Sequence, residues 1–332
     1  LRGVIDIVPA FASVAVFYDP VHSGGYAKLR SELEEIAARA EDVIVSTEPR
    51  NVEVPVCYGG EFGPDLDDLA AQHSLSPAEV VSLHSGADYL VQAIGFVPGF
   101  AYLGGMPVNL ATPRRSSPRR EVPAGSVGIG GGQTGIYPMS TPGGWNLVGR
   151  TPLRMFDANR NEPSLLRAGD RVRFRPIQPA EFRLGDPAGP SAGHRAQSTE
   201  AMPGVEVIQP GMMTTVQDLG RTGHRAEGVV LSGAADAFAL RLANLLVGNP
   251  ECAAGLEFTL IGPELKFLHD TVVALGGAEF GGMPRWRPQK VLAGTHLKLG
   301  RAREGCRVYL AFAGGLDVVP VLGSRSTHLR AG

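Results

Sequence analysis

The sequence predicts a mainly β protein with a smaller α/β part at its N-terminus, divided into two halves by a linker. From residue 87 onward, Gly and Pro separate short apolar runs roughly every 8–12 residues, and no long run with a 3.6-residue period occurs before about residue 230. This spacing is typical of an antiparallel β-barrel or sandwich. Residues 180–203 are rich in Pro, Gly, Ala and Ser and hold few large apolar side chains. Such a segment cannot bury enough surface to offset its ordering entropy, so we place the linker there.

The α/β part is predicted to span residues 1–82. Helical spacing of apolar residues and capping signals predict helices at residues 27–40, 65–72 and 77–82. Ser76 is the expected N-cap of the third helix, and Pro77 occupies its first position. Alternating or short apolar runs predict strands at residues 11–18, 43–45 and 52–56.

Two larger β domains are predicted on either side of the linker, at residues 83–179 and 204–332. In the second domain, residues 234–247 carry the strongest helical pattern of the chain, with Asp236 in the first turn and Gly248 as the stop. Strand-like runs are expected at residues 204–211, 256–260, 265–267, 271–275, 297–299 and 307–312.

Composition limits the classes of function. The 332 residues carry a net charge of −2, whereas nucleic-acid-binding proteins normally have a basic excess. No apolar run approaches the roughly 20 residues that a membrane-spanning helix needs, and no signal-peptide pattern is visible. The cysteines, Cys57, Cys252 and Cys306, are odd in number and widely spaced, which indicates a reducing compartment. We expect a cytoplasmic protein that binds neither nucleic acid nor membrane, and we leave self-association open.

Both ends of the chain read as cut. Leu1 opens it without a methionine, in a run typical of the interior of a domain, and the chain stops shortly after Gly323-Ser324-Arg325. We therefore expect a fragment, or a chain with trimmed ends.

A loop with a dense arginine cluster is the strongest functional signal. Gly95–Gly105 alternates Gly, Pro and aromatic residues too densely for a helix, and Arg114, Arg115, Arg119 and Arg120 then place four positive charges within seven residues. Guanidinium groups bind phosphate or carboxylate through two parallel hydrogen bonds, so this pattern favours an anion site. The alternatives are a solvated basic loop and a loop that pairs with acids of the second half.

The glycine run that follows contains a formal G-x-G-x-x-G at Gly130, Gly132 and Gly135. A dinucleotide fingerprint requires a helix to start there, and Pro138 and Pro142 exclude one. We therefore predict a β-turn whose exposed amides can still bind an anion. No P-loop sequence occurs in the chain, so any ATP must bind without one.

Blocks of several residues resemble two partner families. The blocks of the first half are Gly95–Gly105, Thr112–Arg120, Val122–Ile129, Gln133–Pro138 and Thr141–Trp145. They resemble the Kip-inhibitor-like family, which comprises the first component of allophanate hydrolase and is also known as the B subunit of 5-oxoprolinase. The blocks of the second half are Gln209–Arg221, Leu231–Asp236 and Asn244–Pro250. They resemble the Kip-antagonist-like family, which comprises the second component of allophanate hydrolase and is also known as the C subunit of 5-oxoprolinase. The resemblance implies cyclophilin-like β-barrels in both halves, and halves that pack as an obligate pair.

Motif position and side-chain chemistry together suggest the site residues. The candidate catalytic residues are His84, Arg114, Arg119 and Asp218. The candidate residues for binding substrate or nucleotide are Tyr102, Gly128, Gln133, Thr134, Tyr137, Gln217 and Arg221. Asp218 would bind a substrate N–H or a magnesium ion. No histidine has zinc-ligand spacing to another histidine or to a cysteine, so no dedicated metal site is expected.

Structural roles compete with three of these assignments. His84 can be a buried hydrogen-bonding residue, Tyr137 can be part of the core, and Asp218 can form a structural ion pair with Arg221.

The resemblance implies the B and C components of an ATP-dependent 5-oxoprolinase. Such an enzyme opens 5-oxo-L-proline to L-glutamate with ATP, Mg²⁺ and water, and it requires a separate A component. One alternative is a biotin-dependent carboxyltransferase acting on urea or a related amide. Biotin is usually carried by a Met-Lys dipeptide, and this chain has none. The other alternative is a regulatory inhibitor of a sensor histidine kinase. The permanent joining of an inhibitor-like and an antagonist-like half argues against it, because the two could not be switched independently.

Overall fold

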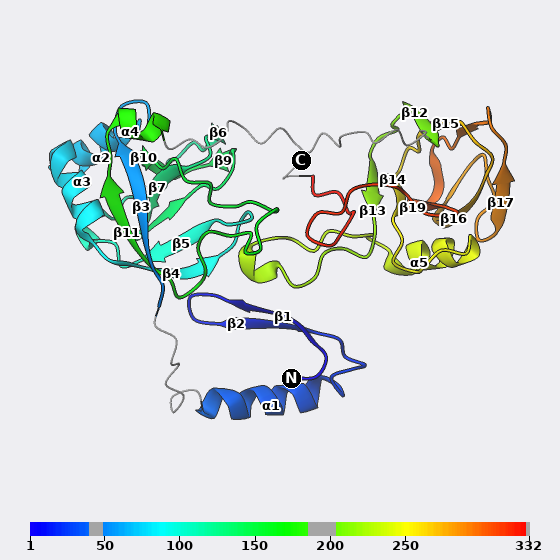
Figure 1. Ribbon diagram of the computed structural model, residues 1–332, viewed down its shortest axis with the longest axis horizontal. Coiled ribbons are helices and arrows are strands. Elements are labelled where there is room, and N and C mark those ends of the chain that lie inside the picture. The colour runs from blue at the N-terminus through cyan, green and yellow to red at the C-terminus, as the bar shows by residue number, and fades with distance from the viewer. Residues whose placement is uncertain (40–48, 185–203, 330–332) are drawn as a thin grey trace. The chain divides into compact units, whose positions relative to one another are not determined.

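The computed structural model describes residues 1–39, 49–184 and 204–329 (Figure 1). The chain divides into two compact units, the first formed by residues 1–190 with 222–229 and the second by residues 191–221 with 230–332. The segment 222–229 thus belongs to the first unit, although residues of the second unit flank it in the sequence. No helix in the described ranges is long and apolar enough to cross a membrane.

A closed barrel of seven strands forms the centre of the first unit (Figure 1). Its strands are β3 (Asn51–Tyr58), β4 (Tyr89–Ile94), β5 (Ala101–Gly104), β7 (Ser126–Gly130), β8 (Gln133–Ile136), β10 (Asn146–Arg150) and β11 (Arg171–Pro176). They follow the order β10-β3-β11-β4-β5-β8-β7, and every pair is antiparallel except β3 with β11. Val54, Leu103 and Ile129 are among the fully buried side chains of its core. The predicted mainly β fold with a barrel in the first half is confirmed.

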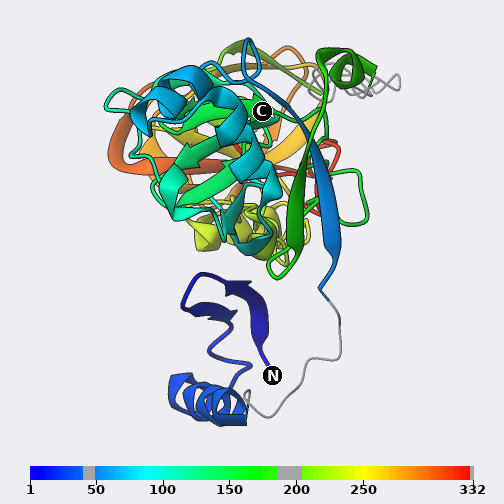
Figure 2. The ribbon, with the colours of Figure 1, turned by 90° about the vertical axis from the view of Figure 1, so that its left-hand side faces the viewer.

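Two helices, α2 (Leu66–Gln72) and α3 (Pro77–Gly86), pack against this barrel (Figure 2). Leu69 and Val80 contribute their buried side chains to the barrel core. Ser76 caps α3 as predicted: its hydroxyl accepts the Glu79 N–H, and the Glu79 carboxylate accepts the Ser76 N–H at 2.7 Å. Both helices were expected, and α3 continues beyond its expected end to Gly86, with His84 of its last turn buried against Phe174 of the barrel.

Strand β3 differs from the predicted division of the first half. The sequence places residues 52–56 in the α/β part, yet β3 lies in the barrel between β10 and β11. It pairs in parallel with β11, a strand far along the chain, and no local pattern indicates such a pairing. The strand expected at residues 43–45 lies outside the described residues.

The N-terminal part of the unit consists of a hairpin and one helix (Figure 2). Its elements are β1 (Val4–Pro9), β2 (Val14–Tyr18) and α1 (Tyr26–Arg39). The structure confirms the helix and the second strand, whereas β1 was not predicted. The buried Asp6 carboxylate of β1 accepts hydrogen bonds from Arg225 Nη1 at 2.6 Å and from the Gly223 N–H at 3.2 Å. These contacts connect the segment 222–229, with its short helix η2 (Arg225–Glu227), to the first unit.

Four smaller elements complete the first unit. They are η1 (Val108–Leu110), β6 (Arg119–Val122), β9 (Thr141–Gly143) and α4 (Pro179–Leu184). Strands β6 and β9 form a two-stranded ribbon outside the barrel. Helix α4 occupies the first residues of the predicted linker, because the Phe182 ring packs 4.6 Å from that of Phe62 and Glu181 pairs with Arg175 at 2.8 Å. The rest of the predicted linker lies outside the described residues.

In its described residues, 204–221 and 230–329, the second unit forms two antiparallel sheets and one α-helix. The smaller sheet has the order β12 (Val205–Gln209), β15 (Glu264–Phe267) and β18 (His296–Lys298). The larger has the order β13 (Thr214–Gln217), β14 (Gly255–Thr259), β19 (Ala302–Phe312), β16 (Thr271–Phe280) and β17 (Pro288–Val291). Helix α5 (Ala237–Leu246) packs on β16 and β19. Its N-cap is Asp236, whose carboxylate accepts the Ala239 N–H at 3.0 Å.

The barrel expected in the second half has a different form in the described residues. Its strands make two separate sheets, which share one core that includes Phe258, Leu265 and Leu275. The register of β16 against β19 shifts at Gly277, where the backbone φ of +99° requires glycine. The predicted strands and the long helix of this half are present, whereas β13 and β17 were not predicted.

Candidate functional site

Four aromatic side chains of the first unit form a cluster that is separate from the barrel core. They are Phe100, Tyr102, Tyr137 and Trp145. The ring of Phe100 lies 4.8 Å from that of Tyr102, 5.2 Å from Tyr137 and 5.5 Å from Trp145. The last two contacts are edge to face, which is a favourable geometry for aromatic pairs. Tyr102 remains partly exposed, whereas the other three rings are buried, so the cluster presents one aromatic edge to solvent.

The glycine run of β7 and β8 makes room for the Trp145 ring. A Cβ added at Gly130 would lie 2.7 Å from indole atoms, and one at Gly135 would lie 3.0 Å from the same ring. At Gly128 an added Cβ would lie 3.1 Å from Trp145 Cβ. Glycine is needed here so that the indole can lie directly against the strand backbones. The structure confirms the predicted β-turn and gives these glycines a packing role.

Arg114 lies beside this aromatic cluster. Its guanidinium carbon is 5.8 Å from the centre of the Trp145 ring, within the range of a cation–π interaction. Burial raises the pKa of Tyr102, and the positive charge of Arg114 partly offsets that rise. Arg114 is exposed and forms no ion pair in the described part of the chain. It is therefore an available cation beside an aromatic surface.

Arg119 and Arg115 share one buried carboxylate, that of Asp65. Arg119 Nη2 donates to Asp65 Oδ1 at 2.6 Å and Arg115 Nη1 donates to the same oxygen at 2.8 Å. Oδ2 accepts the Leu147 N–H at 2.7 Å. One predicted alternative was that the arginines pair with acids of the second half. Arg115 and Arg119 instead pair with Asp65, which belongs to their own unit.

We call Arg114, Arg119, Tyr102, Tyr137 and Trp145 the arginine–aromatic site. It brings together four of the predicted residues. Gly128 adjoins it beneath Trp145. Gln133 begins β8 opposite Gly130 and is partly exposed, and no side-chain contact joins it to the arginines.

His84 and Thr134 lie inside the barrel, away from that site. His84 is fully buried and stacks on Phe174 with ring centres 4.6 Å apart. Its Nδ1 lies 2.8 Å from Tyr58 Oη, and its Nε2 lies 3.0 Å from Thr134 Oγ1. Since the Thr134 hydroxyl donates to the Gly128 carbonyl, it must accept from His84 Nε2–H, which leaves Nδ1 to accept from Tyr58. Burial lowers the pKa of His84 to about 3, so this neutral imidazole suits a structural role.

Asp218 and Arg221 lie in a buried polar cluster of the second unit. Asp218 accepts from Ser324 Oγ at 2.7 Å, from the Arg325 N–H at 2.6 Å and from the Gly220 N–H at 2.7 Å. Ser326 Oγ donates to it as well. Burial alone would raise the pKa of Asp218, but these hydrogen bonds together hold it below its usual value. With all of these donors on its two oxygens, the carboxylate is poorly suited to hold a magnesium ion.

The neighbours of Asp218 are also engaged within the unit. Arg221 is 5% exposed and donates to the carbonyl of Ser326 and to Ser232 Oγ, the latter at 3.2 Å. Burial lowers its pKa, and Asp218 opposes that shift. Gln217 donates to Thr215 Oγ1 at 3.0 Å, and its buried Oε1 has no hydrogen-bond partner. Asp218 and Arg221 form no direct ion pair in the described residues, so the predicted structural ion pair is wrong: Arg221 donates to Ser232 and Ser326, and a catalytic role for Asp218 stays a prediction.

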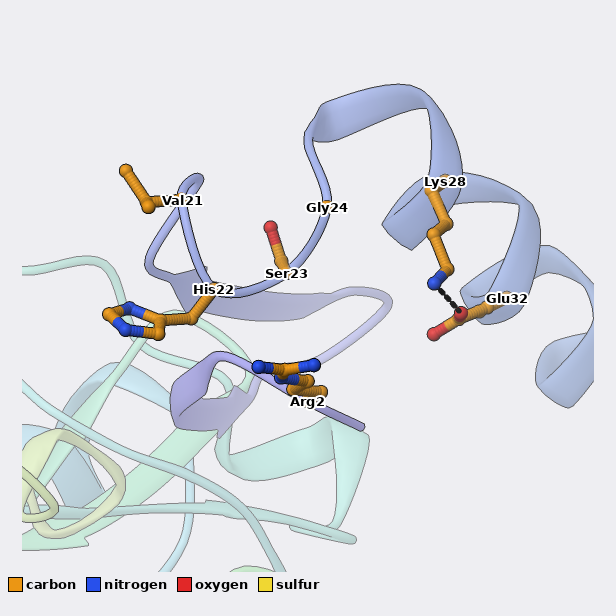
Figure 3. Close-up of a pocket in the computed structure, with 7 residues that line it drawn as sticks. All are labelled: Arg2, Val21, His22, Ser23, Gly24, Lys28 and Glu32. Atoms are coloured by element: carbon orange, nitrogen blue, oxygen red, sulfur yellow. Dashed lines mark ion pairs between the residues drawn. The ribbon is translucent and has the colours of Figure 1, made fainter.

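A cavity of about 170 Å³ lies apart from these residues, in the N-terminal part of the chain (Figure 3). Its lining includes Arg2, His22, Lys28 and Glu32. Lys28 pairs with Glu32 at 3.9 Å and His22 pairs with Asp19 at 2.7 Å. Two of its three basic side chains therefore already have acidic partners, and we do not count it as a functional site.

Sequence reasoning missed three residues around the arginine–aromatic site. Asp65 reads as the start of a helix, Thr141 as part of a Pro-Gly turn, and Gly143 as one more loop glycine. Asp65 contacts Arg119, which is 54 residues away in the sequence, and Gly143 makes room for Tyr137 through a turn that the sequence pattern does not reveal. The arginine cluster was the signal in the sequence that could have indicated Asp65, because two guanidinium groups held in place need a carboxylate nearby.

Two family models match the chain. The carboxyltransferase domain, subdomain C and D, matches residues 1–166, and the carboxyltransferase domain, subdomain A and B, matches residues 227–332. A crystal structure of the protein TTHA0988 superposes with a TM-score of 0.82 at 37% sequence identity, covering 99% of this chain and 65% of that chain.

The relatives carry two kinds of name: subunits of 5-oxoprolinase, and urea amidolyase or urea carboxylase. The 5-oxoprolinase B subunit of Bacillus subtilis is 50% identical over 190 residues, which are 54% of this chain and 78% of the relative. The 5-oxoprolinase C subunit of Escherichia coli K12 is 47% identical over 136 residues, 39% of this chain and 43% of the relative. Urea amidolyase of Lachancea kluyveri is 45% identical over 129 residues, 37% of this chain but 7% of that longer protein. The chain therefore belongs to the carboxyltransferase-domain family, with a segment related to the B subunit of 5-oxoprolinase followed by one related to the C subunit.

Proposed function

We propose that this chain supplies the B and C components of an ATP-dependent 5-oxoprolinase. The reaction converts 5-oxo-L-proline, ATP and water to L-glutamate, ADP and phosphate. Relatives of both halves carry the names of 5-oxoprolinase subunits, which supports this assignment. Because the chain spans 78% of the B-type relative and 43% of the C-type relative, the activity of the whole enzyme is a proposal for this chain.

The observation that carries the proposal is the exposed Arg114 beside Trp145, with Arg119 close to the same aromatic cluster. A lactam carbonyl is a poor electrophile because resonance shares its electrons with nitrogen. Transfer of the terminal phosphoryl group of ATP to its oxygen releases ADP and activates the carbon for attack by water. The ring C–N bond then breaks, the nitrogen takes up a proton, and the resulting acyl phosphate is hydrolysed by a second water to the carboxylate and phosphate. Arginines that face the transferred group stabilise its negative charge, and the edge of Tyr102 offers a surface for a small flat ring.

The proposed partner is a separate A component of 5-oxoprolinase, and the proposed compartment is the cytoplasm. ATP would bring Mg²⁺ as its counter-ion, and we assign no residue of this chain to that ion, because Asp218 is engaged by neighbouring donors. We expect the chain without its A component to be weakly active or inactive.

A carboxyltransferase acting on urea or a related amide is the second candidate. The similarity of residues in this chain to urea amidolyase of Lachancea kluyveri favours it. The same arginines would then hold a carboxylate in place of a phosphoryl group. Since the sequence has no Met-Lys dipeptide, biotin would have to come from a partner protein.

The test is ATP hydrolysis by the chain mixed with its candidate A component, with and without 5-oxoproline, measuring glutamate and phosphate together. We expect glutamate and phosphate in equal amounts, and only when both proteins are present. A folded complex that shows no lactam-dependent turnover would contradict the proposal. The same mixture would then be assayed with a biotinylated partner, bicarbonate and urea.

A further inference from the structure

Two buried polar atoms without a hydrogen-bond partner lie on one face of the β6–β9 ribbon. In the described residues, four buried side-chain atoms lack a partner, and two of them are Arg119 Nη1 and Thr141 Oγ1. Arg119 pairs with Gly143 across the ribbon, and Thr141 precedes Gly143 by two residues, so both side chains project from the same face. Each unpaired buried donor costs stability, and finding two on one small ribbon suggests that a ligand completes them.

The phenol of Tyr137 faces the same place. A Cβ added to Gly143 would lie 2.5 Å from Tyr137 Oη, so only glycine leaves room for the phenol there. Burial raises the pKa of Tyr137, and the hydrogen bond from the Trp145 backbone and the charges of Arg114 and Arg119 only partly offset this rise. The phenol therefore keeps its proton. Since the neighbouring backbone group is an N–H donor and the nearby charged side chains are cations, no acceptor takes up that proton, which is therefore available to a ligand.

The charge balance around this face is positive. The Asp65 carboxylate is shared by Arg115 and Arg119, so two cations face one anion. Arg119 Nη1 and Thr141 Oγ1 have no hydrogen-bond partner in the described part of the chain, and the Tyr137 phenol beside Gly143 adds a third donor. Three converging donors with a positive excess suit an oxygen-rich anion better than they suit a neutral ligand.

We propose that Arg119 Nη1, Thr141 Oγ1 and Tyr137 Oη form a subsite for one oxyanion, a carboxylate or a phosphate, with Asp65 as the residue that positions Arg119. The identity of the anion rests on the proposed function: it is the carboxylate of 5-oxoproline or a phosphate of the nucleotide. Residues 113–118, which border the subsite, are exposed throughout, so opening it to admit an anion breaks few buried contacts.

The position of Asp65 in α2 supports its positioning role. It is the N-cap residue of that helix, where an aspartate normally accepts a backbone N–H of the first turn. Here its side chain makes no capping hydrogen bond and is only 5% exposed, with both oxygens turned to Arg115, Arg119 and the Leu147 N–H. The helix thus forgoes a local stabilising contact, and the carboxylate holds the arginines in place.

The experiment is isothermal titration calorimetry of the full chain with inorganic phosphate, ADP and 5-oxoproline, each added separately. Thr141→Val removes one donor without changing side-chain size, and Asp65→Asn removes the charge that orients Arg119. Thr151→Val and Asp170→Asn are matched controls. Thr151 is a buried threonine, and Asp170 is a buried aspartate that pairs with Arg50 at 2.5 Å. Thermal unfolding of each variant separates loss of binding from loss of fold.

We expect saturable binding of at least one probe and about a tenfold or greater loss of affinity in Thr141→Val and Asp65→Asn, with both controls unchanged. Binding of phosphate and ADP would identify the anion as a phosphate, and binding of 5-oxoproline would identify it as a carboxylate. Equal affinity in folded Thr141→Val and wild type, or no binding of any probe, would overturn the subsite. Lactam-dependent turnover that survives Thr141→Val with unchanged KM would refute the subsite and leave the proposed function intact. If the variants lose anion binding but the wild-type chain never turns over the lactam, the subsite stands and the proposed function is refuted.

Discussion

The two polar clusters of the molecule differ in how fully their hydrogen bonds are made. In the second unit, Asp218 is surrounded by donors from the backbone and from two serines, and Arg221 beside it donates to a carbonyl and a hydroxyl. In the first unit, Arg114 has no acidic partner in the described residues, and Arg119 and Thr141 each keep a buried atom unpaired. The cluster around Asp218 also has an unpaired buried atom, Gln217 Oε1, but that atom is an acceptor and not a donor. Both clusters contain candidate catalytic residues predicted from the sequence, Arg114 and Arg119 in the first unit and Asp218 in the second.

The difference separates a structural cluster from a binding site. A buried polar group whose partners all belong to the protein contributes to stability and has little capacity left for a ligand. A cluster with spare donors is less stable alone and gains its missing bonds when a ligand binds. The predictions below test this contrast, in order of the expected change in the free energy of unfolding.

Asp218→Asn is expected to have the largest effect on stability. The change leaves Arg221 buried without its neighbouring negative charge and turns an amide N–H toward the Ser324 and Ser326 hydroxyls. Leaving one buried donor without its acceptor costs about 1–3 kcal/mol, and because several donors depend on the Asp218 carboxylate we expect a loss of about 3 kcal/mol or more. Urea unfolding followed by circular dichroism would measure this loss. Asp270→Asn, an exposed aspartate of the same unit, is the control.

A catalytic Asp218 would give the opposite pattern. Its asparagine variant would unfold like the wild type, and turnover with the A component would fall by orders of magnitude. That outcome would contradict the distinction drawn between the two clusters.

His84 predicts a dependence of stability on pH. Its pKa is about 3 in the folded protein and 6.5 when unperturbed, so below pH 6.5 the unfolded chain takes up a proton that the folded one refuses. Stability is therefore greatest above pH 6.5 and falls as pH drops toward 3, by about 3 kcal/mol between pH 7 and pH 4. Denaturant unfolding across this range should show a much flatter profile for His84→Gln. The exposed His296→Gln should keep the wild-type slope; if His84→Gln keeps it too, the barrel histidine is not the titrating group.

The sequence predicted elements whose signals are local. The capping box at Ser76 and the aspartate before α5 mark helix starts within a few residues, and both helices are present. The parallel pairing of β3 with β11 was missed because it joins strands from opposite ends of the first unit. The two separate sheets of the second unit could not be distinguished from a closed barrel, since closure depends on strand order and not on the pattern within a strand.

The candidate site follows the same division. Arg114 and Arg119 stand out by charge, and their neighbours Tyr102 and Tyr137 by motif position. The glycines of β7 and β8 were expected to bind an anion through their amides, yet their positions allow Trp145 to lie on them. A packing reason of this kind requires knowledge of which distant side chain covers a strand, and one sequence does not contain it.

Gly130→Ala tests that packing role directly. The new methyl group would lie 2.7 Å from the Trp145 ring, so the indole must move or the strand must bend. We expect a loss of about 1–3 kcal/mol in the free energy of unfolding, together with a shift in tryptophan fluorescence. Gly132→Ala is the matched control, because nothing lies within 4 Å of its Cβ position. Equal stability of the two variants would show that the indole is not held against the strand.

Arg114→Ala is expected to change stability least and ligand handling most. The side chain is exposed and contacts Trp145 only as a cation near a ring, an interaction of about 0.5–1 kcal/mol at such sites. If Arg114 stabilises developing negative charge, its loss should lower kcat about a hundredfold in the assay with the A component, as the removal of a transition-state donor does. Arg120→Ala is the matched control, since Arg120 belongs to the same arginine run, is equally exposed and has no place in the arginine–aromatic site. The comparison distinguishes two explanations of any loss: equal effects of the two changes would mean that the loop acts through its overall charge, whereas an effect confined to Arg114 would show that the cation must lie beside the aromatic cluster.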